Sequence, residues 1–290
     1  MRIFVTGATG FLGSHVVNLC HERGHQVRAH RREASRVPRI PLDREPEWLT
    51  GPLDALGADA FAEADVIMHL AAHTPNHPYD TFERCFYWNV LVALRMLEAA
   101  FQAGVRRWIV AGSCFEYGRS ALRYAEIPTD APLEPVGSYP TSKAAASVGS
   151  VGLAQSLGAS LLIGRIFQMF GPGEDASRFW PSLKRAALAG EDFEMSPGDQ
   201  IRDFVPVEHV ALWFVNALDF PAPQDGTARM ENIGTGRPQT LRAFAEEWWS
   251  RWQAKGELKV GAKPHRPQEV MRFVPAISEA SLALASPRTS

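Results

Sequence analysis

Short apolar runs alternate with longer amphipathic stretches along most of this chain. The apolar run at residues 3–5 predicts a buried strand, and the apolar positions between Phe11 and Leu19 recur at the spacing of one helix face before Gly24. Because strands that alternate with helices pair in parallel and carry helices on both faces, the pattern predicts an α/β fold with a doubly wound parallel sheet. Further strands are expected at 25–30, near Trp48, and at 64–70, 106–111 and 159–166, with long helices at 80–103 and 138–157.

Three glycines connect the first predicted strand to the first predicted helix. Gly7 permits a tight turn, Gly10 lets the backbone approach a pyrophosphate, and Gly13 lets the helix pack closely on the strand. The phosphates of a dinucleotide would then face the N-terminus of the helix. An ordinary strand-to-helix turn is the alternative, but the flanking strand and helix favour a dinucleotide site. We therefore predict a sheet of the Rossmann type.

The alternation of strands and helices weakens after the sequence Phe170-Gly-Pro-Gly. We expect residues 1–170 to form an NAD(P)-binding Rossmann domain and residues 171–290 to form a smaller C-terminal α/β substrate-binding lobe, some elements of which return to the Rossmann part. The segment 118–137 is rich in Pro and Glu, is too long for a simple connector and is expected to border a functional site. Helices of the second part are expected at 179–189, 207–218 and 241–252.

Composition favours a globular protein with a small ligand. The chain has 290 residues, 46% of them hydrophobic, and its 30 basic and 32 acidic residues nearly cancel. No strong overall field is therefore expected to attract nucleic acid or an acidic membrane surface. No apolar run approaches the ~20 residues of a membrane span, and no charged and then apolar leader precedes the first strand, so we expect a cytoplasmic location.

The cysteines indicate neither a disulfide framework nor a metal site. Cys20, Cys85 and Cys114 are odd in number, lie far apart, and belong to no CxxC or Cys/His cluster. We expect three reduced and mostly buried thiols and no bound metal.

A tyrosine and a lysine share one predicted helix face. Tyr139 and Lys143 are four residues apart, which places both side chains on the same side of the helix. A phenol has an unperturbed pKa near ~10, and a neighbouring ammonium and a bound nicotinamide ring favour its ionised form, so Tyr139 can exchange a proton near neutral pH. Ser113 follows the strand at 106–111, where ligands of open parallel sheets bind. Chance spacing and a capping serine are the alternatives for each residue alone, and Glu116 is expected to cap or bond the adjacent loop.

Together these motifs resemble those of the extended short-chain dehydrogenases/reductases, and more narrowly their nucleotide-sugar epimerase/dehydratase branch. The resemblance covers essentially the whole chain and is much more specific for fold and cofactor class than for substrate. The matching motifs, in chain order, are Thr6-Gly-Ala-Thr-Gly-Phe-Leu-Gly13, His69-Leu-Ala-Ala72, Asn89, Ser113-Cys-Phe-Glu-Tyr-Gly118, Tyr139-Pro-Thr-Ser-Lys143, Arg165-Ile-Phe-Gln-Met-Phe-Gly-Pro172 and Arg202-Asp-Phe204.

The resemblance implies roles for individual residues. It implies a catalytic triad of Ser113, Tyr139 and Lys143, with Tyr139 as the acid/base and Lys143 also holding the nicotinamide ribose. Solvated surface charge remains the alternative for Arg202 and Arg266, and a structural or solvated ring is the alternative for His73. The implied cofactor contacts are Gly7, Gly10, Phe11, Leu12, Gly13, Arg31, Arg32, Leu53, Leu70, Ala71, Ala72, Asn89, Tyr139, Lys143 and Ile166, and the implied substrate contacts are His73, Ser113, Gln168, Arg202 and Arg266.

The chain departs from the family pattern in three places. Arg31 and Arg32 stand where members that prefer NAD carry an acidic residue, and cations there suit a 2′-phosphate, so NADP(H) is the expected cofactor and NAD(H) the alternative. A basic surface run is the other explanation of these arginines. Leu53 follows Gly51-Pro52 where an aspartate near the adenine is usual. Cys114 and Phe115 replace the acid pair of members that eliminate water, which disfavours dehydration.

The expected activity is oxidoreduction of a nucleotide-linked sugar. The first hypothesis is NADPH-dependent reduction of a 4-keto-6-deoxy sugar with Tyr139 as the acid/base. The alternative is a nucleotide-sugar 4-epimerase with tightly bound NAD(P), and a remote alternative is a non-catalytic NADP-binding regulatory protein, which the intact triad disfavours. Apolar positions in 81–103 and 138–157 suit a helical interface, and a homodimer is expected. The nucleotide, the sugar and the reacting carbon stay open.

Overall fold

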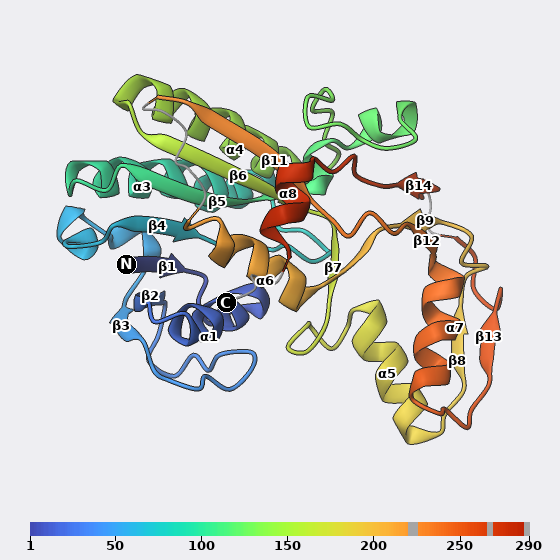
Figure 1. Cartoon of the computed structure of the whole chain (residues 1–290). Helices are drawn as coiled ribbons and strands as arrows, with labels where there is room; N and C mark the ends of the chain where they lie inside the picture. Colours follow the sequence, from blue (N-terminus) through green and yellow to red (C-terminus); the bar gives the residue numbers. More distant parts are fainter. Residues whose placement is uncertain (220–225, 266–268, 287–290) are drawn as a thin grey trace.

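A sheet of seven parallel strands forms the centre of the molecule (Figure 1). The computed structural model describes residues 1–219, 226–265 and 269–286. The spatial order β11-β6-β5-β4-β1-β2-β3 reverses between β1 and β4, which creates the switch point where open α/β sheets bind ligands. The predicted doubly wound sheet is confirmed. Its strands are β1 (Arg2–Thr6), β2 (Gln26–Arg31), β3 (Glu47–Thr50), β4 (Val66–His69), β5 (Arg107–Ser113), β6 (Ser160–Ile166) and β11 (Ala228–Ile233).

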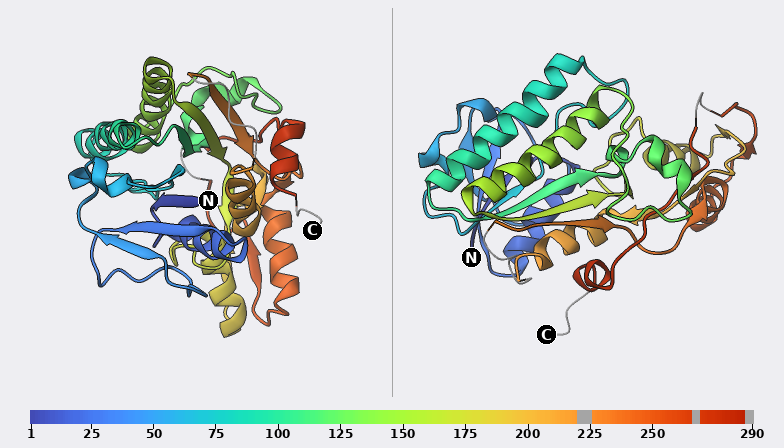
Figure 2. Two further views of the ribbon diagram at one scale, coloured as in Figure 1. Left: turned by 60° about the vertical axis from the view of Figure 1, so that its left-hand side comes forward. Right: turned by 90° about the horizontal axis from the view of Figure 1, so that it is seen from above.

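Helices cover both faces of this sheet (Figure 2). Side chains alternate between the faces of a strand, so Ile3 and Val5 of β1 join one apolar core and Phe4 joins the other. The first core lies under α1 (Phe11–Glu22), α6 (Val207–Asn216) and α8 (Glu279–Leu284), and the second lies under α3 (Ala93–Gln102) and α4 (Ser138–Leu157).

The helix predicted at 80–103 is not a regular α-helix. It consists of α2 (Phe82–Phe86), a π-helical segment at Tyr87–Val92, and α3. A π-helical turn inserts a residue relative to the 3.6-residue period and redirects the side chains around it, often at functional sites. Here it turns Asn89 inward, where the amide donates to Ser142 Oγ of α4 at 2.9 Å. Apolar periodicity alone does not distinguish this segment from a continuous α-helix.

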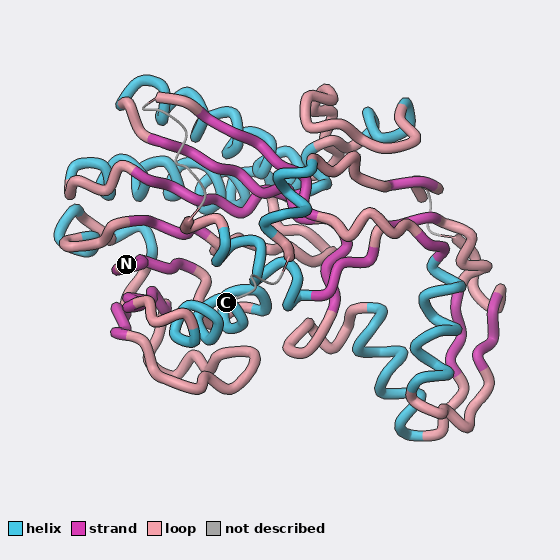
Figure 3. The backbone as a smooth tube through the Cα atoms, in the orientation of Figure 1, coloured by secondary structure: helices cyan, strands magenta, loops and turns pink. Residues whose placement is uncertain are grey.

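A smaller lobe of short elements extends from one end of the large sheet (Figure 3). Aromatic rings form much of its core, with Trp248 at 5.5 Å from Trp180 between ring centroids and Phe170 at 4.9 Å from Phe244. The elements are α5 (Phe179–Ala189), α7 (Leu241–Arg251), the strand pairs β7 (Gln168–Phe170) with β10 (Phe204–Pro206) and β8 (Phe193–Met195) with β13 (Leu258–Val260), and a sheet of β9 (Ile201–Arg202), β12 (Gln239–Thr240) and β14 (Arg272–Phe273).

Several segments beyond residue 170 pack on the large sheet. β11 pairs with β6 at the edge of the sheet. Helices α6 and α8 cover one face of the same sheet. Trp213 of α6 donates to Ser281 Oγ at 2.9 Å, and Asn216 donates to the Leu284 carbonyl at 2.8 Å, so α8 is anchored to α6. The division of the chain near residue 170 stays a prediction, because both sides of that point contribute to one core.

Two further expectations concern the surface and the long connector. Within the described ranges, no helix is long and apolar enough to cross a membrane. Segment 118–137 contains one 3₁₀ turn, at Arg119–Arg123, and none of its residues is among those that line the cleft described below. The segment ends at Gly137, directly before the helix that carries Tyr139, and the expectation that it borders the site stays a prediction. It also packs against the smaller lobe, where the Ile127 amide donates to the Val274 carbonyl at 2.8 Å.

Candidate active site

The glycine turn after β1 has the close packing that its sequence predicts. Gly7 has a φ of +72°, and a Cβ at Gly13 would lie 2.0 Å from the Gly7 carbonyl oxygen. Helix α1 begins directly after Gly10, with no side-chain cap and no acidic residue in its first turn. The first amides of a helix have no partner within it, and its dipole favours an anion there. The turn therefore fits the pyrophosphate of a dinucleotide.

A cleft of about 560 Å³ extends from this turn along the carboxyl ends of the central strands. It brings together almost all of the site residues predicted from the sequence. Arg202 does not line it, and Arg266 lies outside the described residues. The predicted residues that line it are Gly7, Gly10, Phe11, Leu12, Gly13, Arg31, Arg32, Leu53, Leu70, Ala71, Ala72, His73, Asn89, Ser113, Tyr139, Lys143, Ile166 and Gln168.

Two arginines line the cleft at the end of β2, of which Arg31 is the last residue. Arg31 donates from Nε to Thr50 Oγ1 at 3.0 Å, and its guanidinium carbon lies 4.9 Å from the centre of the Trp48 ring. These contacts hold Arg31 beside the cleft. Arg32 is exposed at the same rim.

Ser113, Tyr139 and Lys143 converge at the opposite end of the cleft. Ser113 ends β5, while Tyr139 and Lys143 lie in the first two turns of α4, and all three side chains are buried. The Tyr139 phenol lies near enough to Ser113 for the serine to lower the phenol's pKa, and Lys143 Nζ donates to the Ala111 carbonyl at 2.8 Å. Burial raises the pKa of Tyr139, although Ser113 opposes this shift. Burial lowers the pKa of Lys143.

The buried carboxylate of Glu116 holds the backbone of Ser113 in place. Glu116 Oε1 accepts the Ser113 amide at 2.7 Å while Ser113 Oγ accepts the Phe115 amide at 3.3 Å, which forms a capping box and confirms the capping expected of Glu116. Glu116 Oε2 pairs with Arg165 Nε at 3.0 Å, and neither side chain is exposed by more than 4%. Arg165 also donates to the Tyr117 hydroxyl at 2.9 Å. Arg165 lies on β6 beside Gly112 of β5, and its pairing with Glu116 could not be read from the motif that it begins.

The residues after Ser113 carry no acid pair. Cys114 is buried, and burial raises the pKa of its thiol to about 12, so the thiol stays protonated at neutral pH. Phe115 has no titratable group. Neither residue supplies the general acid or base of an elimination.

Glu174 and Arg178 were missed in the sequence and also line the cleft. Their side chains pair at 3.3 Å, with Glu174 in the loop before α5 and Arg178 at the N-cap of that helix. The Glu174 side chain is 6% exposed, its Oε2 has no hydrogen-bond partner among the described residues, and burial raises its pKa to about 7. No helical spacing identifies them in the sequence, because both residues precede α5.

Arg202 lies behind the cleft wall. Its guanidinium donates to Glu269 at 2.5 Å and to the Ile201 carbonyl at 2.8 Å, and it lies close enough to Cys114 for its charge to favour the thiolate there. The pair with Glu269 explains why Arg202 does not line the cleft.

A second, larger hollow does not share these features. It measures about 910 Å³ and is an open surface between α7 and β13, lined by residues such as Arg242, Trp249 and Lys259. It contains neither a glycine turn nor a buried titratable group. Among the described residues, no cluster of His, Cys, Asp or Glu could hold a metal ion.

Comparisons with known proteins agree with this geometry. Residues 3–234 match the model of the NAD dependent epimerase/dehydratase family. The chain is 25% identical to the putative UDP-arabinose 4-epimerase 4 of Arabidopsis thaliana, over 92% of this chain and 67% of that protein. It is 26% identical to the dTDP-glucose 4,6-dehydratase of Streptomyces antibioticus, over 83% of this chain and 74% of that protein.

Solved structures show the same architecture over the whole chain. MoeE5 in complex with UDP-glucuronic acid and NAD has a TM-score of 0.82 and 28% identity, and the match covers 100% of this chain and 95% of MoeE5. The UDP-glucuronic acid 4-epimerase from Bacillus cereus in complex with NAD also has a TM-score of 0.82, over 100% of this chain and 94% of that one. At 21% identity, this second match shows the fold alone.

Proposed function

This chain belongs to the NAD dependent epimerase/dehydratase family and is an NAD(P)-dependent enzyme of nucleotide sugars, and on that premise we propose that it is a nucleotide-sugar 4-epimerase. The reductase that we expected first has less support. The relatives named above are epimerases and a dehydratase, and both activities end with the cofactor in the redox state in which it began.

The residues next to Ser113 favour epimerisation over dehydration. Elimination of water needs an acid and a base beside the sugar, and this chain has Cys114 and Phe115 there. Epimerisation needs only a group that removes and returns one proton at the reacting hydroxyl. This is the observation that carries the proposal.

Tyr139 is the residue placed to move that proton. Its phenol and the Ser113 hydroxyl line the same cleft and lie near one another, so Ser113 can orient the sugar oxygen by a hydrogen bond. Lys143 adds a positive charge at the same end, which favours the phenolate once substrate and cofactor are bound. A bound nicotinamide would supply hydride transfer at the sugar carbon, and Lys143 and Ile166 line the part of the cleft beside Tyr139 that would hold it. The keto sugar must then rotate in the cleft, so that the hydride returns to the opposite face of the carbon and the proton returns to the oxygen.

The reductase remains a second candidate because of the two arginines at the end of β2, which line the cleft. Arg31 and Arg32 suit the 2′-phosphate of NADPH, a cofactor that reductases consume. We propose NADP(H) as the preferred cofactor on this ground, although MoeE5 binds NAD. Equal KM values for NADPH and NADH would remove this preference.

We also propose that the enzyme is a homodimer through the face formed by α2, the π-helical segment and α4. Phe82, Leu91 and Val148 are large apolar side chains exposed on these elements. Burial of such residues on a second copy is favourable. Light scattering of the purified protein measures the oligomeric state directly.

A screen with product analysis tests the proposed reaction. UDP-glucose, UDP-glucuronic acid, UDP-arabinose and dTDP-glucose are incubated with the enzyme and catalytic NAD(P), and products are identified by NMR. An epimerase converts at least one sugar into its C4 epimer without net consumption of cofactor, and Tyr139→Phe loses about 10²- to 10⁴-fold in kcat. Stoichiometric loss of NADPH with a 4-keto sugar, and no epimer, would replace the epimerase by the reductase.

A further inference from the structure

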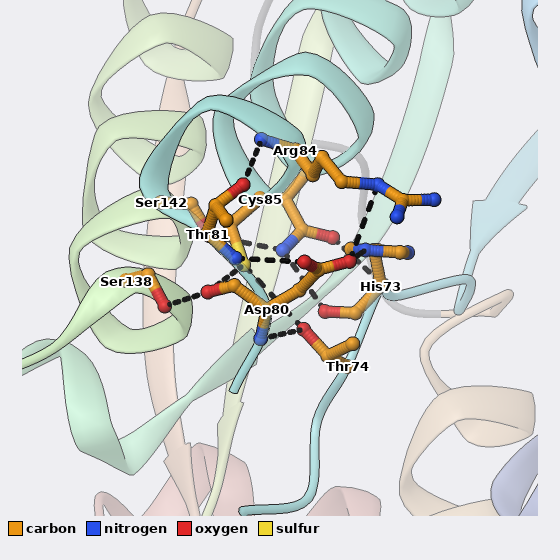
Figure 4. Close-up of polar contacts among 9 residues, drawn as sticks. His73, Thr74, Asp80, Thr81, Arg84, Cys85, Ser138 and Ser142 are labelled. Carbon is orange, nitrogen blue, oxygen red and sulfur yellow. Dashed lines mark hydrogen bonds and ion pairs between the residues drawn. The ribbon is translucent and has the colours of Figure 1, made fainter. Parts of the chain in front are cut away.

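The loop between β4 and α2 forms the wall of the cleft beside Tyr139. His73 belongs to this loop and lines the cleft. Figure 4 shows that the polar side chains of the loop point toward one another and toward α4. At their centre lies Asp80, a residue that the mechanism above does not use.

Asp80 holds the His73 ring through its carboxylate. His73 Nε2 and Asp80 Oδ2 are 2.9 Å apart, and the two side chains are only 17% and 23% exposed. The other carboxylate oxygen accepts the Thr81 amide at 2.8 Å, and Arg84 Nε lies 3.3 Å from Oδ2. With three partners, the carboxylate has little freedom to rotate, so the ring that it bonds is also fixed.

The backbone of His73 is fixed independently. Its amide donates to Asn89 Oδ1 at 2.7 Å, and its carbonyl accepts from Asn89 Nδ2 at 3.3 Å. The next residue, Thr74, has a φ of +47°, which is a strained conformation for a β-branched residue. Such strain persists only where the surrounding contacts impose it.

The same loop is tied to the helix that carries the acid/base. The Asp80 carbonyl accepts from Ser138 Oγ at 2.5 Å, and Ser138 directly precedes Tyr139. The Tyr79 ring lies 5.4 Å from the Tyr139 ring between centroids. His73 therefore lies at a defined place relative to the group that moves the proton.

We propose that Asp80 is a positioning residue for substrate recognition, which holds the His73 imidazole so that its Nδ1 accepts a hydrogen bond from a hydroxyl of the bound sugar. When a carboxylate accepts the proton on Nε2, the neutral ring keeps a lone pair on Nδ1. This inference rests on the proposed function, because it places a nucleotide sugar in the cleft.

The tautomer of His73 tests the first half of the inference without any substrate. The chain has nine histidines, and ¹⁵N-labelled histidine in the wild-type protein and in His73→Gln identifies the His73 signals. We expect the wild-type ring to carry its proton on Nε2. In Asp80→Asn the amide donates as well as accepts, so part of the population shifts to the Nδ1-protonated form. Identical His73 signals in the two proteins would overturn the inference.

Arg84→Met is the matched control. It removes another partner of the same carboxylate but leaves the bond between His73 and Asp80 in place. The tautomer should therefore stay as in the wild-type protein. A shift as large as that of Asp80→Asn would mean that the ring responds to the charge of the loop and not to its bond with Asp80.

Binding of UDP-glucose and UDP tests the second half. Loss of one hydrogen bond to the sugar should raise the Kd of UDP-glucose about five- to tenfold in both Asp80→Asn and His73→Ala. The Kd of UDP should not change. In the double variant, UDP-glucose should bind as in His73→Ala. Further weakening there, or an equal loss for UDP, would show a merely structural role. If the wild-type protein binds neither probe, the proposed UDP-sugar substrate fails, and the tautomer experiment still decides whether Asp80 positions the ring.

Discussion

Glu116 and Arg165 form a buried ion pair at 3.0 Å directly beneath the serine of the candidate triad. The same carboxylate accepts the Ser113 amide, so one side chain both ends β5 and balances the charge of Arg165. Removing one partner of a buried pair leaves the other charge without compensation. The ion pair that holds Ser113 in place is therefore also one whose loss should strongly lower the free energy of unfolding.

Glu116→Gln is expected to lower the free energy of unfolding by about 3–5 kcal/mol, because Arg165 stays buried and charged. The exposed pair between Arg123 and Glu134 provides the control, and Glu134→Gln should change the free energy of unfolding far less than Glu116→Gln, because water screens the pair. Urea unfolding of the three proteins measures both values. Similar losses in the two variants would mean that Arg165 finds water or another partner when Glu116 is neutral.

Gly13→Ala is expected to abolish cofactor binding. A Cβ at this position would lie 2.0 Å from the Gly7 carbonyl oxygen, so the turn that faces the pyrophosphate must move. Gly152→Ala in α4 is the matched control, because its Cβ meets nothing within 4 Å and alanine favours a helix by about 0.5–1 kcal/mol. Fluorescence titration with NADH and NADPH checks both variants. Unchanged affinity in Gly13→Ala would exclude this turn as the phosphate site.

The cysteines are expected to react slowly in the native protein. All three are buried, and burial raises the pKa of Cys20 and of Cys114 to about 12. Thiolate is the reactive form, so a thiol reagent at pH 8 should label three thiols only after denaturation. Cys114→Ala should retain kcat within a few-fold, since a protonated thiol performs no acid/base step there. A loss of kcat as large as that of Tyr139→Phe would show that Cys114 takes part in the reaction.

Glu174 is expected to make stability depend on pH near neutrality. Its pKa is raised from 4.5 to about 7 by burial, so the folded state prefers the protonated carboxyl. This contribution is complete below about pH 4.5 and is lost as the pH rises through 7, by about 1–3 kcal/mol. Glu174→Gln should therefore lose less stability than the wild-type protein between pH 5 and pH 8. Thermal unfolding at both pH values measures the difference, and the exposed Glu98→Gln serves as the control.

Local patterns were enough for the parts of the site that lie within one turn or one helix. The strand, glycine turn and helix at the N-terminus are neighbours in sequence, and Tyr139 and Lys143 share a face because the helix period brings residues four apart together. The cap expected of Glu116 likewise forms with Ser113, three residues before it. In each case the interacting groups are separated by a few residues whose backbone geometry is nearly fixed.

Tertiary structure decided the contacts between distant segments. Arg165 reaches Glu116 only because β5 and β6 are adjacent in the sheet, and Arg202 pairs with Glu269, which lies 67 residues further along the chain. The π-helical segment and the bond between His73 and Asp80 likewise depend on how a loop packs on α4. Apolar spacing records which side of an element is buried, whereas the partner of a buried charge is set by the register and packing of elements far apart in the chain.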